Sequence, residues 1–457
     1  MAEPRVDVVV VGGGIAGLTA ARTILKRGLS CVVLEAGPRW GGVVHTAREA
    51  GFLFDAGPDS ILAQKPEGVA LCRELGLGDH LMPTNPRQRT VYVLRGGRLH
   101  AMPDGMVLGV PTRLWPLAAS GLFSPAGKLR MALEPFVPVR RDGADESIAA
   151  FVRRRLGSEA LDRLCEPLLG GIHAGDPERL SMRAAFPRLP EMEQRHGGLL
   201  RGMRAAAARA TGGGPGFVSL AGGMGELADA LVASIPEDAR RLDAPARVVR
   251  DGDAFVVEAG ASAWRARAVV LAVPAHRAAP LLAPLAPDAA AALGGIPFAS
   301  TATVLLGLRR LDVAHALDGY GLVVPRREGR RTLACSFVST KLSGRAPDGH
   351  VLLRGFVGGI QAPEVLDRDD ATLVQYVYED MAPVLGLRGS PVFARVFRWP
   401  NGTPQMEVGH GDRVAAIDKA LVRVPGLHLT SGGFRGAGLP DVIADAQRVG
   451  SGLSFGV

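Results

Sequence analysis

The sequence has few of the residues that build metal sites and disulfide frameworks. Four cysteines occur in 457 residues, and no two of them form a C-x-x-C pair. The ten histidines show no H-x-x-x-H spacing. Zinc knuckles and redox dithiols need their ligands or thiols at such short spacings. We therefore predict no metal site and a reducing compartment.

Long apolar runs and a strong charge imbalance are also missing. No run reaches the roughly 18 apolar residues of a spanning helix. The nearest, 106–123, is interrupted by Pro111, Arg113 and Pro116, and is compatible with a membrane surface or a cavity wall. The net charge of +8 is modest for this length, and no Lys/Arg run alternates with aromatics. We expect no nucleic-acid partner, while an acidic small substrate or anionic lipid fits this charge.

The composition is that of a globular protein, with 47% hydrophobic and 21% charged residues. A chain of 457 residues exceeds one ordinary core and predicts two or three domains. The N-terminus has no basic segment followed by a small-residue cleavage site. We expect a cytoplasmic protein and leave open a peripheral contact with the inner face of the membrane.

The stretch 6–35 contains a complete strand, turn, helix and strand pattern. The β-branched run at 6–11 predicts a strand that is buried on both faces. Glycines in G-x-G-x-x-G spacing follow, then a helical pattern over 15–27 and a second apolar strand over 31–34. This order is typical of a dinucleotide-binding βαβ unit.

Each glycine of this motif has its own physical task. Gly12 permits the tight turn, Gly14 lets the backbone approach a pyrophosphate, and Gly17 lets the helix pack against its strand. Ile15 and Ala16 are the first residues of the predicted helix. Its N-terminus offers unpaired N–H groups and partial positive charge to phosphates.

An acidic residue follows at the distance typical of a ribose ligand. Glu35 lies 18 residues past Gly17, close to the spacing of about 20 in dinucleotide-binding units. Its carboxylate accepts hydrogen bonds from ribose hydroxyls and repels the 2′-phosphate of NADP. The alternative is a glycine turn without a ligand.

Two further features favour FAD over NAD. Arg39, Gly41 and Gly42 form a loop that can fold back on the pyrophosphate, although an ordinary turn is the alternative. Far along the chain, a glycine-rich segment at 431–438 precedes a helix at 441–449. The positive end of that helix suits the negative charge of a reduced cofactor ring.

The middle of the chain predicts helices followed by a second sheet. Helical patterns cover 124–133, 144–156 and 158–169, and the arginine run 153–155 is interpreted as a solvated helix face. The low-complexity segment 205–216 is interpreted as a mobile loop.

Strand patterns return after this segment. The apolar run 268–273 predicts a strand with which the chain returns to the first sheet. Strand-like runs between 301 and 357 suggest a mostly antiparallel sheet, followed by a helix at 371–385. A hairpin is predicted at 91–102 and a helix at 66–75.

Several segments together resemble a known superfamily, the FAD-dependent amine oxidases and desaturases. They are the glycine motif with Glu35, the 39–42 loop, AGGMGELADAL at 221–231 and G-x-G-L-P-D at 436–441. Three more segments are similar to the porphyrinogen oxidases of haem synthesis. These are AGPDS at 56–60, EPLLGGIHAGDPERLSMRAAFP at 166–187 and RWPNGTPQMEVGH at 398–410.

Within that family, the sequence is most similar to the bacterial coproporphyrinogen III oxidases. It has GPDS at 57–60 where protoporphyrinogen enzymes usually have GPNS, a MPDG…GVPT stretch at 102–112, and GLPD at 438–441. One departure is Val442, where a cysteine is common in either branch.

The resemblance implies oxidation of coproporphyrinogen III to coproporphyrin III by FAD, with O₂ as acceptor and H₂O₂ as by-product. Protoporphyrinogen IX oxidase is the alternative within the family. Another flavin oxidase or desaturase, or a flavin-fold protein that only binds a ligand, is the alternative outside it. An amine oxidase normally has a covalent-flavin cysteine near its C-terminus, where the nearest cysteine here is Cys335.

The resemblance also implies an α/β fold. It has a discontinuous FAD-binding Rossmann-like domain, a mixed-sheet substrate domain and a helical insertion. The FAD-binding domain is predicted at 1–85, 217–278 and 396–457, the substrate domain at 86–97, 183–216 and 279–395, and the helical domain at 98–182. The helical domain is the predicted site of any membrane contact, and the protein is expected to be a monomer or homodimer.

The motifs and the resemblance place the cofactor against residues from both ends of the chain. The set comprises Gly12, Gly14, Ile15, Ala16, Gly17, Glu35, Ala36, Arg39, Gly41, Gly42, Gly57, Pro58, Asp59, Ser60, Val248, Trp399, Gly438, Leu439 and Pro440. Trp399 edges the flavin or packs in the core.

Two side chains are expected to act on the substrate. Asp59 is the predicted proton acceptor, with a turn residue that bonds its own backbone as the alternative. Lys65 is expected to pair with a propionate at the mouth of the site, because anions near an apolar cavity need cationic partners. A solvated surface lysine is the alternative.

Overall fold

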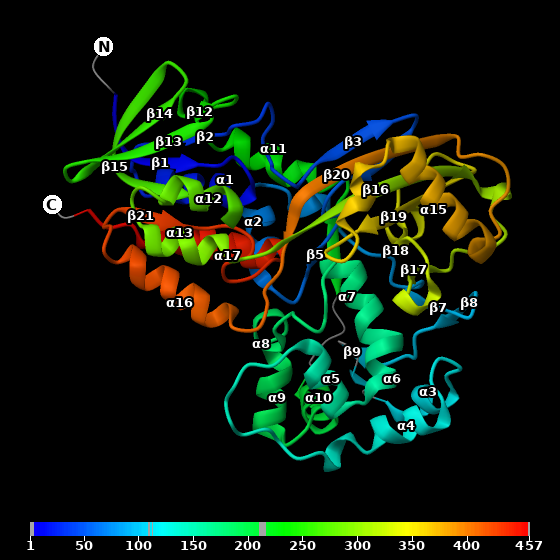
Figure 1. Ribbon diagram of the computed structural model, residues 1–457. Coiled ribbons are helices and arrows are strands. Elements are labelled where there is room, and N and C mark those ends of the chain that lie inside the picture. The colour runs from blue at the N-terminus through cyan, green and yellow to red at the C-terminus, as the bar shows by residue number, and fades with distance from the viewer. Residues whose placement is uncertain (1–3, 108–109, 112, 210–215, 456–457) are drawn as a thin grey trace.

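The computed structural model describes residues 4–107, 110–111, 113–209 and 216–455 (Figure 1). Two seven-stranded sheets lie in the upper half of the view, and a group of helices lies below them. The α/β fold, with its discontinuous Rossmann-like unit, second sheet and helical insertion, is confirmed. The predicted domain boundaries stay a prediction.

The first sheet is assembled from three separate parts of the chain. Its order is β12 (Arg240–Arg241), β2 (Cys31–Leu34), β1 (Arg5–Val11), β15 (Ser262–Leu271), β14 (Ala254–Ala259) and β13 (Ala246–Asp251), and β21 (Leu427–Leu429) also pairs with β15. β1 runs parallel to β2 and to β15. The predicted return of 268–273 to the first sheet is therefore confirmed.

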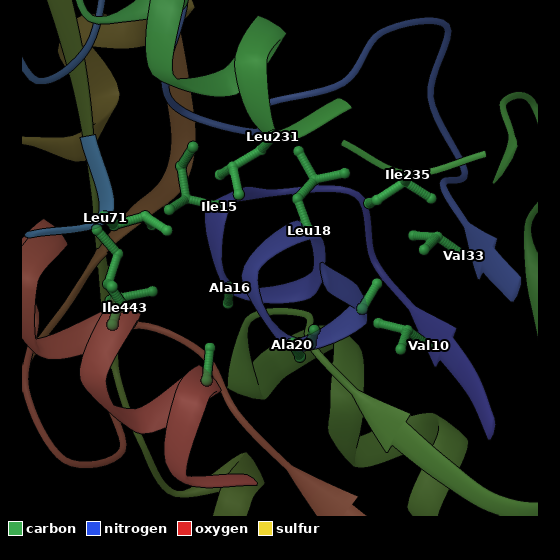
Figure 2. Packing of buried hydrophobic residues seen from close by; sticks show 14 of the residues in the cluster. Val10, Ile15, Ala16, Leu18, Ala20, Val33, Leu71, Leu231, Ile235 and Ile443 are labelled. Atoms are coloured by element: carbon green, nitrogen blue, oxygen red, sulfur yellow. The ribbon is translucent and has the colours of Figure 1, made fainter. Parts of the chain in front are cut away.

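Helices cover both faces of this sheet because successive residues of β1 point to opposite sides. Val8 and Val10 pack under α1 (Ile15–Lys26), α11 (Gly225–Ala233) and α17 (Leu439–Gly452). Val9 and Val11 face α12 (Ala275–Leu282), α13 (Pro287–Gly294) and α16 (His410–Leu421). In Figure 2, Leu18 of α1 lies beside Leu231 of α11.

The second sheet is antiparallel except at one pair of strands. Its order is β20 (Phe393–Pro404), β16 (Phe298–Arg309), β19 (His350–Gly358), β18 (Thr332–Phe337), β17 (Gly319–Val323), β7 (Thr90–Arg95) and β8 (Arg98–Ala101). Only β17 and β7 run parallel. This confirms the mostly antiparallel sheet and the hairpin at 91–102, and α15 (Asp370–Leu385) packs on one face.

Shorter elements join the two sheets. They are β3 (Thr46–Glu49), β4 (Phe52–Asp55), β5 (Ile61–Leu62), α2 (Pro66–Glu74), β6 (Leu81–Pro83), β11 (Phe217–Leu220) and α14 (Val338–Lys341). β3 pairs with β4, and β11 lies between β5 and β6. The predicted helix at 66–75 is confirmed by α2.

The bounds of the elements in the helical group differ from their prediction at three places. It comprises β9 (Met106–Val107), β10 (Val110–Pro111), α3 (Leu114–Ala119), α4 (Pro125–Ala132), α5 (Ile148–Arg155), α6 (Ser158–Ala160), α7 (Glu166–His173), α8 (Met182–Ala185), α9 (Arg188–His196) and α10 (Leu199–Arg209). The helix predicted from 144 begins only at Ile148, because the Ser147 hydroxyl caps it. A π-helical turn, Leu161–Cys165, interrupts the helix predicted at 158–169.

The third difference concerns the predicted mobile loop at 205–216. Residues 205–209 belong to α10, so the predicted loop is wrong for these residues. The helix continues through them because alanine is the best helix former. Residues 210–215 lie outside the described part of the chain.

The arginine run was wrongly interpreted as a solvated face at one position. Arg155 is fully buried and pairs with Glu134, while Arg153 is half exposed and pairs with Glu178. Three consecutive helical side chains point about 100° apart, so they cannot share one environment. The Glu134 carboxylate also accepts the N–H groups of Leu199 (2.7 Å) and Leu200 (3.0 Å), which begin α10.

Apolar side chains are exposed on α3, α4 and the turn that follows. Trp115 is 80% and Phe136 78% exposed, and Leu129 and Leu133 lie one turn apart on the same side of α4. Among the described residues, no helix has the length and hydropathy to cross a bilayer. Contact with a membrane surface stays a prediction.

The buried Arg155–Glu134 pair yields a first prediction. Arg155→Ala leaves the Glu134 carboxylate buried without its cation, so the free energy of unfolding should fall by about 3–5 kcal/mol. The matched variant Arg153→Ala breaks an exposed pair and should cost less than about 1 kcal/mol. Urea unfolding of both variants measures the difference, and equal losses would contradict this account.

Candidate cofactor and substrate site

The strand, turn and helix of the glycine motif pack so closely that two positions exclude any side chain. A Cβ on Gly12, whose φ is +112°, would lie 2.6 Å from the Ala272 carbonyl oxygen. A Cβ on Gly17 would lie 1.8 Å from the Gly12 carbonyl oxygen. The strand, turn and helix thus meet as the motif predicts.

Gly14 is different because the protein itself leaves room beside it. A Cβ there would meet only the Gly42 Cα atom, at 3.9 Å. Gly14 is the N-cap of α1, no side chain caps this helix, and its first turn, which includes Ile15 and Ala16, holds no acidic residue. The N–H groups of α1 therefore suit a phosphate that approaches across Gly14.

Glu35 is held by backbone N–H groups at the end of β2. Its Oε2 atom accepts the Gly13 N–H at 2.7 Å, and Oε1 accepts the Gly37 N–H at 2.8 Å. Ala36, beside it, is exposed. β1 and β2 run parallel, so both strands end at the same sheet edge, and Glu35 lies there beside the glycine turn.

The Arg39–Gly42 loop folds back onto the glycine turn, as its sequence suggested. The Gly41 N–H donates to the Gly13 carbonyl at 2.9 Å. The Arg39 guanidinium donates to the carbonyls of Trp40 at 3.2 Å and Val44 at 3.3 Å, and to that of Gly42. Arg39 thus shapes its own loop.

The AGPDS turn joins the two sheets at this place. A Cβ on Gly57 would lie 1.9 Å from the Val43 carbonyl oxygen. The indole N–H of Trp399, on β20, donates to the Ala56 carbonyl at 3.2 Å. The turn, which also contains Pro58, therefore lies between the Arg39–Gly42 loop and the second sheet.

Asp59 is buried between two cations, Lys341 at the end of α14 and Arg354 on β19 of the second sheet. Its Oδ1 lies 2.7 Å from Lys341 Nζ, and its Oδ2 lies 3.1 Å from Arg354 Nη2. Burial alone would raise the pKa of Asp59, but the charges of Lys341 and Arg354 outweigh it and hold this pKa well below its usual range. Such a carboxylate is a weak proton acceptor.

The two cations also fix the neighbouring backbone and hydroxyl. Lys341 Nζ donates to Ser60 Oγ at 3.2 Å, and Arg354 Nη1 donates to the Gly57 carbonyl at 3.0 Å. Sequence reasoning missed both residues because they lie about 280 and 295 positions beyond Asp59, outside any motif.

The N-terminus of α17 lies beside that of α1. Ile443 and Ile15 share one core cluster, and a Cβ on Gly450 would lie 2.9 Å from the Thr23 Cβ, so the two helices run parallel (Figure 2). Gly438 is the N-cap of α17 and, like Gly14, is not joined by a capping side chain. Leu439 and Pro440 form the first turn.

Lys65 pairs with an acid in that same first turn. Its Nζ atom contacts the Asp441 carboxylate, and its side chain is 37% exposed. Lys65 also stands at the N-cap of α2, so it lies where α2 and α17 begin. The structure thus brings Lys65 to the α17 end of the candidate site.

Val248 lies apart from these groups. It is on the edge strand β13, and its side chain packs in the core with Phe255 and Val257. Its contact with the cofactor stays a prediction.

His173 is a polar residue for which sequence reasoning found no role. It ends α7, its ring meets the Phe186 ring edge-on at 5.9 Å, and its carbonyl accepts the Gln405 side-chain N–H at 2.9 Å. Ala174 follows with φ of +49°, a strained conformation for alanine. Burial lowers the pKa of His173 to about 4, so the ring is neutral at neutral pH.

Comparison with known proteins identifies the family. The family model for flavin-containing amine oxidoreductases matches residues 15–449. The chain belongs to this family. A flavin is therefore the type of cofactor that this family contains.

Curated relatives narrow the similarity to porphyrinogen oxidases. The chain is 32% identical to the coproporphyrinogen III oxidase of Bacillus subtilis (strain 168), over 97% of each protein. It is 35% identical to that of Propionibacterium freudenreichii subsp. freudenreichii, over 96% of this chain and 89% of the relative. The chloroplast protoporphyrinogen oxidase of Nicotiana tabacum is 31% identical over 98% and 85%. The predicted resemblance is confirmed.

Solved structures share the fold. A protein from Exiguobacterium sp. 255-15, provisionally named a protoporphyrinogen oxidase, superposes with a TM-score of 0.86 at 33% identity, over 99% of this chain and 98% of its own. The cyclohexylamine oxidase of Brevibacterium oxydans IH-35A gives a TM-score of 0.72 at 18% identity, over 98% of each chain, which shows the fold alone.

The partly buried imidazole of His173, with its lowered pKa, predicts a loss of stability in acid. Between pH 6.5 and 4 the unfolded chain takes up a proton that the folded protein does not, so stability falls as the pH falls through this window. From pH 7.5 to 5, the wild type should lose about 1–2 kcal/mol more than His173→Phe. Urea unfolding at both pH values measures this, and parallel losses would refute it.

Proposed function

We propose that the protein is an FAD-dependent coproporphyrinogen III oxidase that uses O₂ and releases coproporphyrin III and H₂O₂. The observation that carries this proposal is the full-length similarity to two bacterial coproporphyrinogen III oxidases. In addition, the candidate site has the parts that are needed to bind a flavin dinucleotide. Protoporphyrinogen IX oxidation is the second candidate, supported by the plant relatives.

FAD fits the candidate site because the site is long and has polar groups at both ends. Glu35 suits the adenosine ribose, the N-terminus of α1 suits the pyrophosphate, and Gly438 at the start of α17 suits the reduced ring. A flavin held there would supply the two-electron acceptor for the substrate's hydride, with O₂ as the final acceptor.

The chain's own residues set the position of this chemistry. Lys341 and Arg354 keep Asp59 ionised and hold the AGPDS turn against the second sheet. The indole of Trp399 fixes the Ala56 carbonyl of the same turn. A porphyrinogen loses six hydrogens in three two-electron oxidation cycles. The turn must therefore keep one position through all three cycles.

Proton removal makes smaller demands on the protein. The pyrrole N–H protons of the substrate can leave through solvent. The depressed pKa of Asp59 makes it a weak base, so we propose that its main contribution is to hold the turn in place rather than to accept protons. The role of proton acceptor that the sequence suggested for Asp59 stays a prediction.

A substrate comparison tests the proposed function. Purified holoenzyme should oxidise coproporphyrinogen III with a kcat/KM at least about tenfold above that for protoporphyrinogen IX, because two additional propionates are available for cationic partners. Fluorescence of the porphyrin product measures the rate, and three H₂O₂ per porphyrin should appear. A preference for protoporphyrinogen IX would transfer the assignment to the second candidate.

The FAD site is tested at Gly14. Gly14→Ala adds a methyl group that contacts no protein atom closer than 3.9 Å, and Gly14 has an extended backbone that alanine adopts freely. The variant should fold like the wild type but bind FAD more weakly, since the methyl group occupies the phosphate approach. Circular dichroism of the apoprotein and titration with FAD measure the two properties. Unchanged FAD affinity would contradict the proposed cradle.

The substrate cation is tested at Lys65. Lys65→Ala should raise the KM for coproporphyrinogen severalfold, since a propionate paired with this partly exposed lysine would gain up to about 1 kcal/mol, and bound FAD should stay intact. Lys65→Arg should restore the KM. The matched surface variant Lys26→Ala, at the far end of α1, should leave it unchanged. An unchanged KM in Lys65→Ala would remove this residue from the site.

A further inference from the structure

A cavity of about 70 Å³ lies inside the helical group. Its walls come from α5, α7, α8, α9 and α10, together with β10. Phe151, Cys165 and Leu199 are among its lining residues, and only Leu168 and Phe186 of the lining are partly exposed. The lining of the cavity thus consists almost entirely of buried side chains.

The chemistry of the lining selects an apolar occupant. All lining side chains are apolar except the thiol of Cys165, and burial raises the pKa of that thiol to about 12, so it stays neutral. A buried water needs two to four polar partners, and cavities without them stay dry and accept apolar molecules.

The size of the cavity limits the occupant to a very small molecule. A volume of about 70 Å³ is too small for a tetrapyrrole. It holds a molecule of a few atoms, such as a diatomic gas. Dioxygen is the one apolar molecule of this size that the proposed function consumes, and three are needed for each porphyrin formed.

A series of packed contacts leads from the cavity wall toward the candidate site. Phe186 lines the cavity and contacts His173, which ends the same helix that carries Leu168. His173 is held by Gln405, next to Pro404, and a Cβ on Gly433 would lie 2.5 Å from Pro404. The chain of contacts therefore runs from the cavity to the glycine loop that precedes α17.

We propose that this cavity binds dioxygen and supplies it to the flavin site past Phe186 and His173. The binding of a small apolar gas follows from the cavity itself. The assignment of dioxygen, and its use in catalysis, rests on the proposed function.

Xenon is the probe for gas binding, because it is apolar and enters dry cavities of this kind. Xenon-pressurised crystals of the holoenzyme should show xenon between Phe151 and Leu168. Leu168→Phe fills the cavity from its partly exposed edge, so this variant should not bind xenon there. Leu129→Phe makes the same change on the exposed face of α4, so this variant should still bind xenon in the cavity. Absence of xenon from the wild-type cavity would overturn the proposal.

Oxygen kinetics test the supply role. In Leu168→Phe, kcat/KM for O₂ should fall severalfold, while anaerobic reduction of the flavin by porphyrinogen should keep its wild-type rate. Xenon pressure should lower kcat/KM for O₂ in the wild type and not in Leu168→Phe, which also controls for a folding defect of the variant. Equal O₂ kinetics in Leu168→Phe and Leu129→Phe would overturn the supply role.

The two proposals fail separately. If the wild-type protein oxidises no porphyrinogen, the proposed function is wrong, whereas xenon in the cavity would still support its capacity for a gas. If porphyrinogen is oxidised and no xenon binds, only the cavity proposal is overturned.

Discussion

The ion pairs of Asp59 with Lys341 and Arg354 are the interaction on which the site depends. A buried carboxylate needs opposite charge nearby, and here one cation, Arg354, comes from β19 of the second sheet and the other, Lys341, from α14, which follows β18. Because Arg354 also donates to the carbonyls of Asp55 and Gly57, the AGPDS turn is fixed to β19 at several points. The AGPDS turn therefore cannot shift relative to β19 without breaking buried charge pairs.

This constraint explains how a cofactor cradle can be built from distant segments. The N-termini of α1 and α17 lie side by side because the two helices pack in parallel on one face of the first sheet. Neither helix is capped by its own N-cap side chain, so their N–H groups remain available to a ligand. The second sheet then closes over the cradle through Trp399 and the AGPDS turn. The helical group adds a separate buried charge pair, Arg155–Glu134, and its own apolar cavity.

Local patterns predicted the elements whose signals lie within a short window. The glycine motif, the hairpin at 91–102 and the apolar strand at 268–273 were all recognised, because periodicity and turn residues act over a few positions. Errors arose where tertiary contacts override such signals. Arg155 is buried although its neighbours are charged. The helix at 205–209 was missed for a local reason: its low-complexity composition suggested a loop, but its alanines are strong helix formers. The long strand β20 was missed because it contains Pro400 and Gly402.

The sequence by itself determined the family, the Rossmann-like start of the chain and the residue types of a flavin cradle, since these depend on short motifs with fixed spacing. Only the tertiary structure decided which cations hold Asp59, that Lys65 pairs with Asp441, and that His173 is a neutral ring beside Phe186. The physical reason is that charge and burial are set by partners that lie outside any short window of sequence, in the case of Asp59 and Lys65 hundreds of residues away. No local pattern encodes such partners, whereas a strand or a glycine turn is specified by its immediate neighbours.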